Sequence, residues 1–203
     1  DFSPEINYHK HYINRYAFLF NEYIGNKYVY LPELSLRYTG QKTFQFDNSH
    51  KTIALYLGGE NKEFRKYPDE YAVQLLRLLN RQGYNLLLIG DENDNIKHTQ
   101  YAEEARIDHL INLTARTTIE GFINTIANVD LIITIDSSAL HIAPAVKTPF
   151  IALMGLSTSP TSTILPKVPL GRILKIENNL IREEDYIRNI TPDLILKTIS
   201  ELI

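Results

Sequence analysis

Hydrophobic positions change their spacing in a regular way from residue 52 onward. Short, nearly continuous apolar runs alternate with longer stretches whose apolar residues recur at helical spacing. The short runs predict strands, which are TIALYLGG (52–59), YNLLLIGDEND (84–94), HLINLT (109–114), DLIITI (130–135), PFIALMG (149–155) and GRILKIE (171–177). The longer stretches predict helices, which are residues 68–83, 96–107, 117–128, 138–147 and 191–203.

Several of the predicted helices carry recognisable end residues. Pro68 opens the first helix and Gly83 follows it, which is the usual asymmetry of helix ends. Thr117 and Glu120 have the spacing of a capping box, and Thr191 with Pro192 predicts the start of the last helix. Pro144 is unusual inside a helix and predicts a kink there.

The order of these elements predicts a Rossmann-like, doubly wound parallel sheet over residues 51–203. Strands that are apolar throughout, each followed by an amphipathic helix, are typical of an α/β fold with helices on both faces. Residues 1–50 read differently, as a helical arm rich in aromatic residues (8–26) followed by an extended linker (28–46) that we expect to pack on the main domain.

The carboxyl ends of the strands should line one crevice, because ligands of open parallel sheets bind beyond that edge. The loops concerned follow Leu57, Ile89, Leu113, Ile135 and Leu153.

Composition narrows the function. The 203 residues carry a net charge of −3 without a dense Lys/Arg run, which argues against nucleic-acid binding. The absence of cysteine excludes disulfides, thiolate catalysis and cysteine-ligated zinc. No apolar run approaches the roughly 20 residues of a membrane span, so we expect a soluble protein. The chain starts at Asp1 and has only Met154, which indicates a processed product or a fragment.

The junction between the fourth predicted strand and its helix is the first candidate for chemistry. Asp136 ends the strand, and Ser137 and Ser138 start the helix, whose free N–H groups and dipole favour an anion. His141 lies one turn deeper on nearly the same face, in reach of the ligand or the adjacent loop. The alternative is that Ser137, Ser138 or Asp136 only caps the helix.

Three segments together resemble a known family. LGGENKEFRKYPDEYA (57–72), LLLIGDEND (86–94) and residues 112–155 resemble the C-terminal half of family 9 glycosyltransferases, the ADP-heptose:lipopolysaccharide heptosyltransferases and their relatives. The resemblance covers about residues 53–160. Where the family usually reads Asp-Thr-Gly-Pro-Met-His, this chain has Ser138, Ala139 and Leu140 in place of glycine, proline and methionine.

The resemblance implies a donor diphosphate site. Lys66 takes the place of the family's diphosphate-binding lysine, and Tyr67 replaces the usual tryptophan beside it. A lysine after the first strand can face the helix N-terminus after the fourth, which would clamp a dianion from two sides. The alternative is a solvated lysine in a charged run. Gly59, with Gly58, would let the backbone approach the ligand, or would only form a turn.

The nucleoside half of the donor is placed by the same resemblance. It implies that Glu92, or Asp91 beside it, binds the ribose, since a carboxylate can accept both vicinal hydroxyls. Thr114 would border the base, whereas Thr117 is more simply a helix cap. The loop of residues 155–161 would close over the diphosphate.

The function implied is that of the donor-binding half of a GT-B glycosyltransferase. The donor would be a nucleotide-diphospho-sugar, with ADP favoured, and transfer would be inverting and independent of a metal, since no His/carboxylate cluster has metal-ligand spacing. No other cofactor is implied. The catalytic base and the glycan or lipid-linked acceptor would belong to a missing N-terminal domain, in lipopolysaccharide or related glycan synthesis. The location implied is the cytoplasm or the inner face of the membrane, with peripheral association of the full enzyme.

Two other interpretations stay open at this point. A non-catalytic module with this fold would bind the nucleotide sugar, or only a protein partner, without transfer. An NAD-dependent enzyme is disfavoured because no G-x-G-x-x-G follows the first strand. We expect the isolated chain to bind a nucleoside diphosphate but to turn over poorly.

Overall fold

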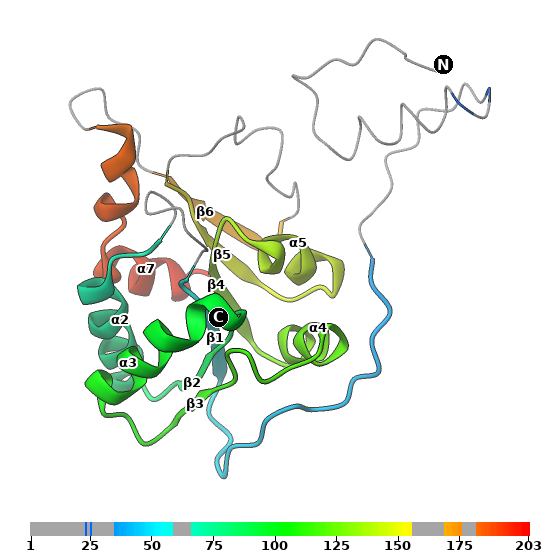
Figure 1. Cartoon of the computed structure of the whole chain (residues 1–203), viewed down its shortest axis with the longest axis horizontal. Coiled ribbons are helices and arrows are strands. Elements are labelled where there is room, and N and C mark those ends of the chain that lie inside the picture. Colours follow the sequence, from blue (N-terminus) through cyan, green and yellow to red (C-terminus); the bar gives the residue numbers. More distant parts are fainter. Residues whose placement is uncertain (1–22, 24, 26–34, 59–65, 156–168, 176–181) are drawn as a thin grey trace.

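The computed structural model describes residues 23, 25, 35–58, 66–155, 169–175 and 182–203. Strands are β1 (Thr52–Tyr56), β2 (Asn85–Leu88), β3 (Leu110–Asn112), β4 (Leu131–Ile135), β5 (Phe150–Leu153) and β6 (Gly171–Leu174). Helices are α2 (Asp69–Arg81), α3 (Asn95–Ala105), α4 (Ile119–Ala127), α5 (Ser138–Ala145) and α7 (Pro192–Ile199), with 3-10 helices η2 (Glu92–Asp94) and η3 (Glu183–Asn189). Figure 1 shows their arrangement.

The six strands form one parallel sheet in the order β3-β2-β1-β4-β5-β6. This is the doubly wound order, and it confirms the predicted fold class. The chain moves outward from β1 to β3, then crosses to β4 on the other side of β1. The topological switch point therefore lies between β1 and β4, where Tyr56 is paired with Thr134.

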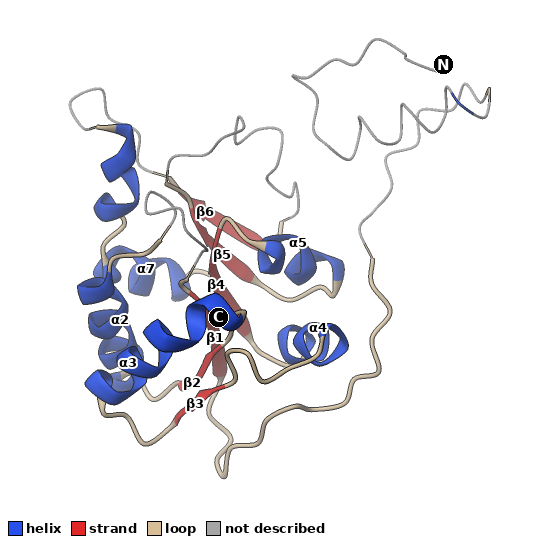
Figure 2. Cartoon of the chain, viewed as in Figure 1, coloured by secondary structure: helices blue, strands red, loops and turns tan. Residues whose placement is uncertain are grey.

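Helices lie on both faces of the sheet (Figure 2), and an apolar core fills the space between the sheet and the helices on each face. Alternate strand residues point to opposite sides, so Leu55 and Ile133 pack with α2, α3 and α7. Ala54 and Ile132 pack with α4 and α5. Because strands β1, β2, β4 and β5 are buried over their whole length, their sequences are continuously apolar rather than alternating.

The helix ends confirm some predicted signals and correct others. Gly83 follows α2 with φ of +83°, and the Thr191 hydroxyl caps α7 with Pro192 as the first helical residue. The capping box of Thr117 and Glu120 is wrong, because the neighbouring Thr118 hydroxyl accepts the N–H of Gly121 at 3.1 Å. The cap of α4 is therefore one residue later than predicted.

The described part of the extended linker, residues 35–46, lies against the α4 and α5 face (Figure 1). The N–H of Leu36 donates to the carbonyl of Ala145 at 3.1 Å, and the Asn124 amide donates to the Thr39 hydroxyl at 2.9 Å. Phe44, together with Phe46, packs on the core beneath. The expected packing of the linker is confirmed for these residues. The helix expected over residues 8–26 lies outside the described part, and the boundary at residue 50/51 stays a prediction.

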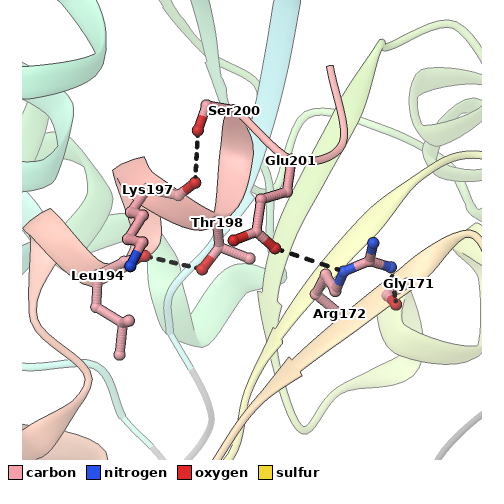
Figure 3. A network of polar contacts seen from close by, with 7 residues as sticks. All are labelled: Gly171, Arg172, Leu194, Lys197, Thr198, Ser200 and Glu201. Atoms are coloured by element: carbon pink, nitrogen blue, oxygen red, sulfur yellow. Dashed lines mark hydrogen bonds and ion pairs between the residues drawn. The ribbon is translucent and has the colours of Figure 1, made fainter.

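The C-terminal residues are tied to the opposite, amino edge of the sheet. Figure 3 shows Arg172 of β6 facing Glu201, with 3.9 Å between Nε and Oε2, and Thr198 donating to the Leu194 carbonyl at 2.8 Å. The Lys51 ammonium, just before β1, donates to the carbonyl of Ile203 at 2.7 Å. The exposed ion pair contributes little by itself. These contacts lie at the edge of the sheet opposite to the predicted ligand crevice.

Candidate functional site

The carboxyl edge at the switch point brings two predicted site residues to neighbouring strands. Lys66 follows β1, and Ser137 follows β4, which is hydrogen-bonded to β1. An open α/β sheet binds its ligands at this place because the two flanking helices run to opposite faces and leave a crevice. The topology therefore supports placing both residues at one site.

Ser137 is the N-cap of α5. Its hydroxyl accepts the N–H of Ala139 at 3.2 Å and lies 2.9 Å from the hydroxyl of Thr134, which donates to the Ile135 carbonyl. Since the Thr134 proton is used, the Ser137 hydroxyl donates to Thr134. The Ser137 hydroxyl therefore caps α5, as one of the alternatives predicted, and its role toward a diphosphate stays a prediction.

Ser138 is different from its neighbour. It is exposed as the first residue of α5, whereas Asp136 and Ser137 are half-buried. The bonds that Ser137 makes to the N–H groups of Ala139 and Leu140 do not use the N–H of Ser138. Ser138 therefore presents a hydroxyl at the positive end of the helix.

His141 lies one turn along the same helix and is exposed. Pro144 sits in the last turn, one residue before α5 ends at Ala145, and the kink predicted there stays a prediction. A helix this short keeps its N-terminus close to every residue it carries.

Tyr67 anchors the segment that carries Lys66. Its ring is 1% exposed, its hydroxyl donates to the Ile190 carbonyl at 2.9 Å, and its N–H donates to the Leu57 carbonyl at 3.4 Å. Burial raises the pKa of the Tyr67 phenol, so it stays a neutral donor. Lys66 itself is half-buried beside this anchor. Gly59 lies outside the described residues.

Asp69, the first residue of α2, forms the other side of this loop. Lys97 and Tyr101 of α3 both donate to its carboxylate, at 2.5 Å each. Burial alone would raise the pKa of Asp69, but these hydrogen bonds and the charges of Lys97 and Lys66 lower it below its ordinary value. Asp69 therefore remains ionised and joins α2 to α3.

The β2 loop contains an acid that sequence reasoning missed. Asp91 is exposed and caps η2 by accepting the N–H of Asn93 at 2.8 Å, and Glu92 is exposed. Asp94 is only 4% exposed. A Cβ on Gly58 would lie 1.7 Å from Asp94 Oδ1, and one on Gly90 would lie 2.7 Å from its Oδ2. Gly58 thus makes room for Asp94, a role that neither predicted use of the glycine included.

The loop after β3 is held by a hydrogen bond between two buried side chains. Thr114 is fully buried, and its hydroxyl lies 2.7 Å from Nδ1 of His98, which is also fully buried on α3. Burial lowers the pKa of His98 from 6.5 to about 4, against an opposing effect of Asp91, so the imidazole is neutral. Ala115 then has φ of +59°, and its N–H donates to the Gly90 carbonyl at 3.1 Å.

The structure thus groups the predicted residues unevenly. Lys66, Asp136, Ser137, Ser138 and His141 belong to the switch point, and Asp91 and Glu92 to the adjacent β2 loop. The Thr114 side chain is buried against His98, and most of the 155–161 loop lies outside the described residues. The ligand roles assigned to all of these stay predictions. Within the described ranges, no group of three or more His, Asp or Glu residues is arranged to hold a metal ion.

The sheet order and the parallel pairing define a Rossmann-like, doubly wound class of α/β domain. The sequence model of glycosyltransferase family 9 (heptosyltransferase) matches residues 2–184. The chain therefore belongs to glycosyltransferase family 9. The match begins well before residue 53, so the first fifty residues share in the family likeness and the resemblance was assigned too narrowly.

Known proteins agree with this membership. The chain is 30% identical over 158 residues to lipooligosaccharide heptosyltransferase 2 of Haemophilus influenzae. The alignment covers 72% of this chain and 45% of that protein. The crystal structure of the family 9 glycosyl transferase from Veillonella parvula superposes with a TM-score of 0.80 at 17% identity, over 98% of this chain and 62% of that one. E. coli ADP-heptose lps heptosyltransferase II gives 0.69 at 22% identity, over 87% and 54%.

These comparisons also relate the length of the chain to that of its relatives. It spans about half the length of the curated relatives it matches. The superpositions show that the α/β fold is that of GT-B heptosyltransferases. Among the helices of the described ranges, none has the length and apolar character needed to cross a bilayer.

Proposed function

We propose that this chain provides the donor-binding half of a heptosyltransferase-like enzyme and binds a nucleoside-diphospho-sugar, with ADP as the favoured nucleotide. Family membership supports the class of reaction, and the relative described as an ADP-heptose heptosyltransferase supports the choice of nucleotide. The transfer is proposed to serve lipopolysaccharide or related glycan synthesis at the cytoplasmic side of the membrane.

The observation that carries the proposal is the start of α5 at the switch point. The chain turns directly from β4 into a helix whose first residue, Ser138, is exposed, and Ser137 fixes that turn from below. A diphosphate placed here would meet the helix N-terminus and the Ser138 hydroxyl. The ammonium group of Lys66 would meet it from the adjacent strand β1.

The chemistry follows from this arrangement of charge. In an inverting displacement at the anomeric carbon, the acceptor oxygen forms its bond as the bond to the diphosphate breaks, and negative charge builds on the departing diphosphate. Lys66, Ser138 and the helix N-terminus would stabilise that charge more strongly in the transition state than in the ground state. We propose that the reaction needs no metal, and that the acceptor and the catalytic base come from the half of the enzyme that this chain does not include.

The nucleoside would lie over the neighbouring strands. Glu92 is exposed at the end of β2, where its carboxylate can accept the two ribose hydroxyls. The loop after β3 would then border the base. This loop ends at Thr118, the N-cap of α4, at the same edge of the sheet. His141 and Asp136 would support the diphosphate side.

Calorimetric titration of the chain with ADP and with UDP tests the proposal. ADP should bind, and Lys66→Ala should weaken binding by about 1.5–3 kcal/mol because a charge-assisted contact is lost. Lys147→Ala is the matched control, since it removes the same charge from an exposed lysine after the C-terminal end of α5. It should leave the affinity unchanged.

Three outcomes would contradict the proposal or a part of it. Equal affinities of wild type and Lys66→Ala would remove Lys66 from the site. Failure of both nucleotides to bind would favour a module that has kept the fold for another partner. The departures at Ser138, Ala139 and Tyr67 from the family's usual residues suggest this alternative. Robust sugar transfer by the isolated chain would contradict the assignment of the base to another domain.

A further inference from the structure

His98 is an unusual residue for the place it occupies. It is fully buried on α3, and no described residue approaches its Nε2 within hydrogen-bond distance. Buried polar atoms are nearly always paired, and an unpaired one costs free energy. An apolar side chain would fill the same space without that cost, so the position is poorly explained by core packing alone.

Among the described residues, the hydrogen bond of the His98 side chain leads to a loop rather than to another core element. Its Nδ1 meets the Thr114 hydroxyl at 2.7 Å, and the N–H of Thr114 donates to the Asn112 side chain at 3.0 Å. The next residue, Ala115, has φ of +59°, a conformation that residues with a Cβ rarely adopt. Strain of this kind persists only where the surroundings hold it, and it concentrates at functional sites.

His98 also connects this loop to the other side of the site. Its ring packs on Tyr101 with 5.8 Å between centroids, and the Tyr101 hydroxyl donates to Asp69 at the start of α2. Asp69 lies three residues after Lys66 and is influenced by its charge. One helix, α3, therefore contacts both the segment that follows β1 and the segment that follows β3.

We propose that His98 is a positioning residue for the nucleoside part of the donor, which it serves by holding Thr114 and, through it, the loop of residues 115–118 in one conformation. The proposal rests on the proposed function, because that function puts a nucleoside beside this loop. His98 touches no ligand itself. The loss of its bond would let the left-handed turn at Ala115 relax and would move the residues that start α4.

The test compares Thr114→Val, which keeps the shape and removes the hydroxyl, with His98→Leu and with the double variant of the full chain. Hydrogen exchange of the amides of residues 115–118 reports on the loop, and calorimetry with ADP reports on the site. Each single variant should speed exchange there about tenfold and weaken ADP binding about fivefold to twentyfold. The double variant should be no worse than either single one, because both remove the same bond.

Two further variants separate positioning from mere stability. Thr114→Ser keeps the hydroxyl and should stay within about twofold of wild type in both measurements. Thr148→Val removes another buried hydroxyl, which donates to the Ile126 carbonyl at 2.8 Å before β5, at the opposite edge of the sheet. It should lower the melting temperature without changing ADP affinity or exchange at residues 115–118.

The proposal would be overturned if Thr114→Val lowered the melting temperature but left exchange and ADP affinity unchanged. It would also be overturned if the effects of Thr114→Val and His98→Leu were additive. A wild-type chain that binds neither ADP nor UDP would refute the proposed function and the nucleotide role of His98 together. In that case the exchange data alone would still show whether His98 holds the loop.

Discussion

The β4–α5 and β3–α4 junctions occupy the same edge of one sheet but are built in opposite ways. Between β4 and α5 the chain needs only Asp136 and Ser137, and the first helical residue is an exposed serine. Between β3 and α4 it runs through residues 113–118, buries Thr114, and starts the helix with Ile119, which is 83% exposed.

The difference shows two ways of fixing a ligand-binding turn. The short junction is held by its own backbone and by one serine cap, so its N-terminus can stay open toward an anion. The long junction has more conformational freedom to lose on folding, and it is locked by a side chain from another helix, His98. The β4–α5 junction presents the positive end of a helix, and the β3–α4 junction presents a loop held in one conformation.

The largest expected effect is a loss of stability at low pH, caused by His98, which holds the long junction. The pKa of His98 is about 4 in the folded chain, compared with 6.5 for an ordinary histidine. Between these values the unfolded chain binds a proton that the folded chain does not, so the stability rises with pH. The free energy of unfolding should reach its full value above about pH 6.5, and it should fall by about 3 kcal/mol as the pH drops to about 4.

Urea unfolding at several pH values measures this loss. His98→Leu should remove most of the slope between pH 6.5 and 4. Asp69 does not interfere, because its lowered pKa affects the stability only at still lower pH. An unchanged slope in His98→Leu would show that other groups cause the acid sensitivity.

The second effect compares the two caps directly. Ser137→Ala and Thr118→Ala each remove a hydroxyl that accepts a first-turn N–H, and each should destabilise the chain by about 1 kcal/mol. Ser137→Ala should cost more, because its hydroxyl also pairs with Thr134. Denaturant midpoints would show the order. A larger loss for Thr118→Ala would contradict the difference in design.

The smallest effect on stability is expected at Ser138. Ser138→Ala should change the free energy of unfolding by less than about 0.5 kcal/mol, since the side chain is exposed and does not cap. It should nevertheless weaken ADP binding by about 1 kcal/mol, because one hydrogen bond to the diphosphate is lost. Ser49→Ala, at an exposed serine before β1, is the control. Ser137→Ala weakening binding more than Ser138→Ala would reverse the roles given to the two serines.

The fold could be predicted from local patterns, whereas parts of the site could not. The continuous apolar runs around Leu55 and Ile133 already imply buried parallel strands, because no other arrangement covers both faces. The cap of α4 was predicted one residue too early because Thr117 and Thr118 are chemically alike. Ser137 and Ser138 could not be told apart for the same reason.

The missed residues depend on contacts between distant parts of the chain. Asp94 can be buried because Gly58, 36 positions earlier, leaves space for its carboxylate. His98 and Thr114 meet only after β2 and β3 have paired and α3 has packed across them. No spacing rule relates such partners. That Lys66 and Ser138 follow neighbouring strands at one edge could be inferred, because the carboxyl ends of parallel strands share that edge, and their meeting at one ligand stays a prediction.

An amide NMR titration of the chain with ADP tests the central claim most directly. We predict the largest shift changes at the amides of Ser138 and Lys66, beside β4 and β1, with little change at Lys147 and Thr148 at the other end of α5. Saturable shifts confined to that other end, with Ser138 and Lys66 unaffected, would contradict a nucleoside diphosphate site at the switch point.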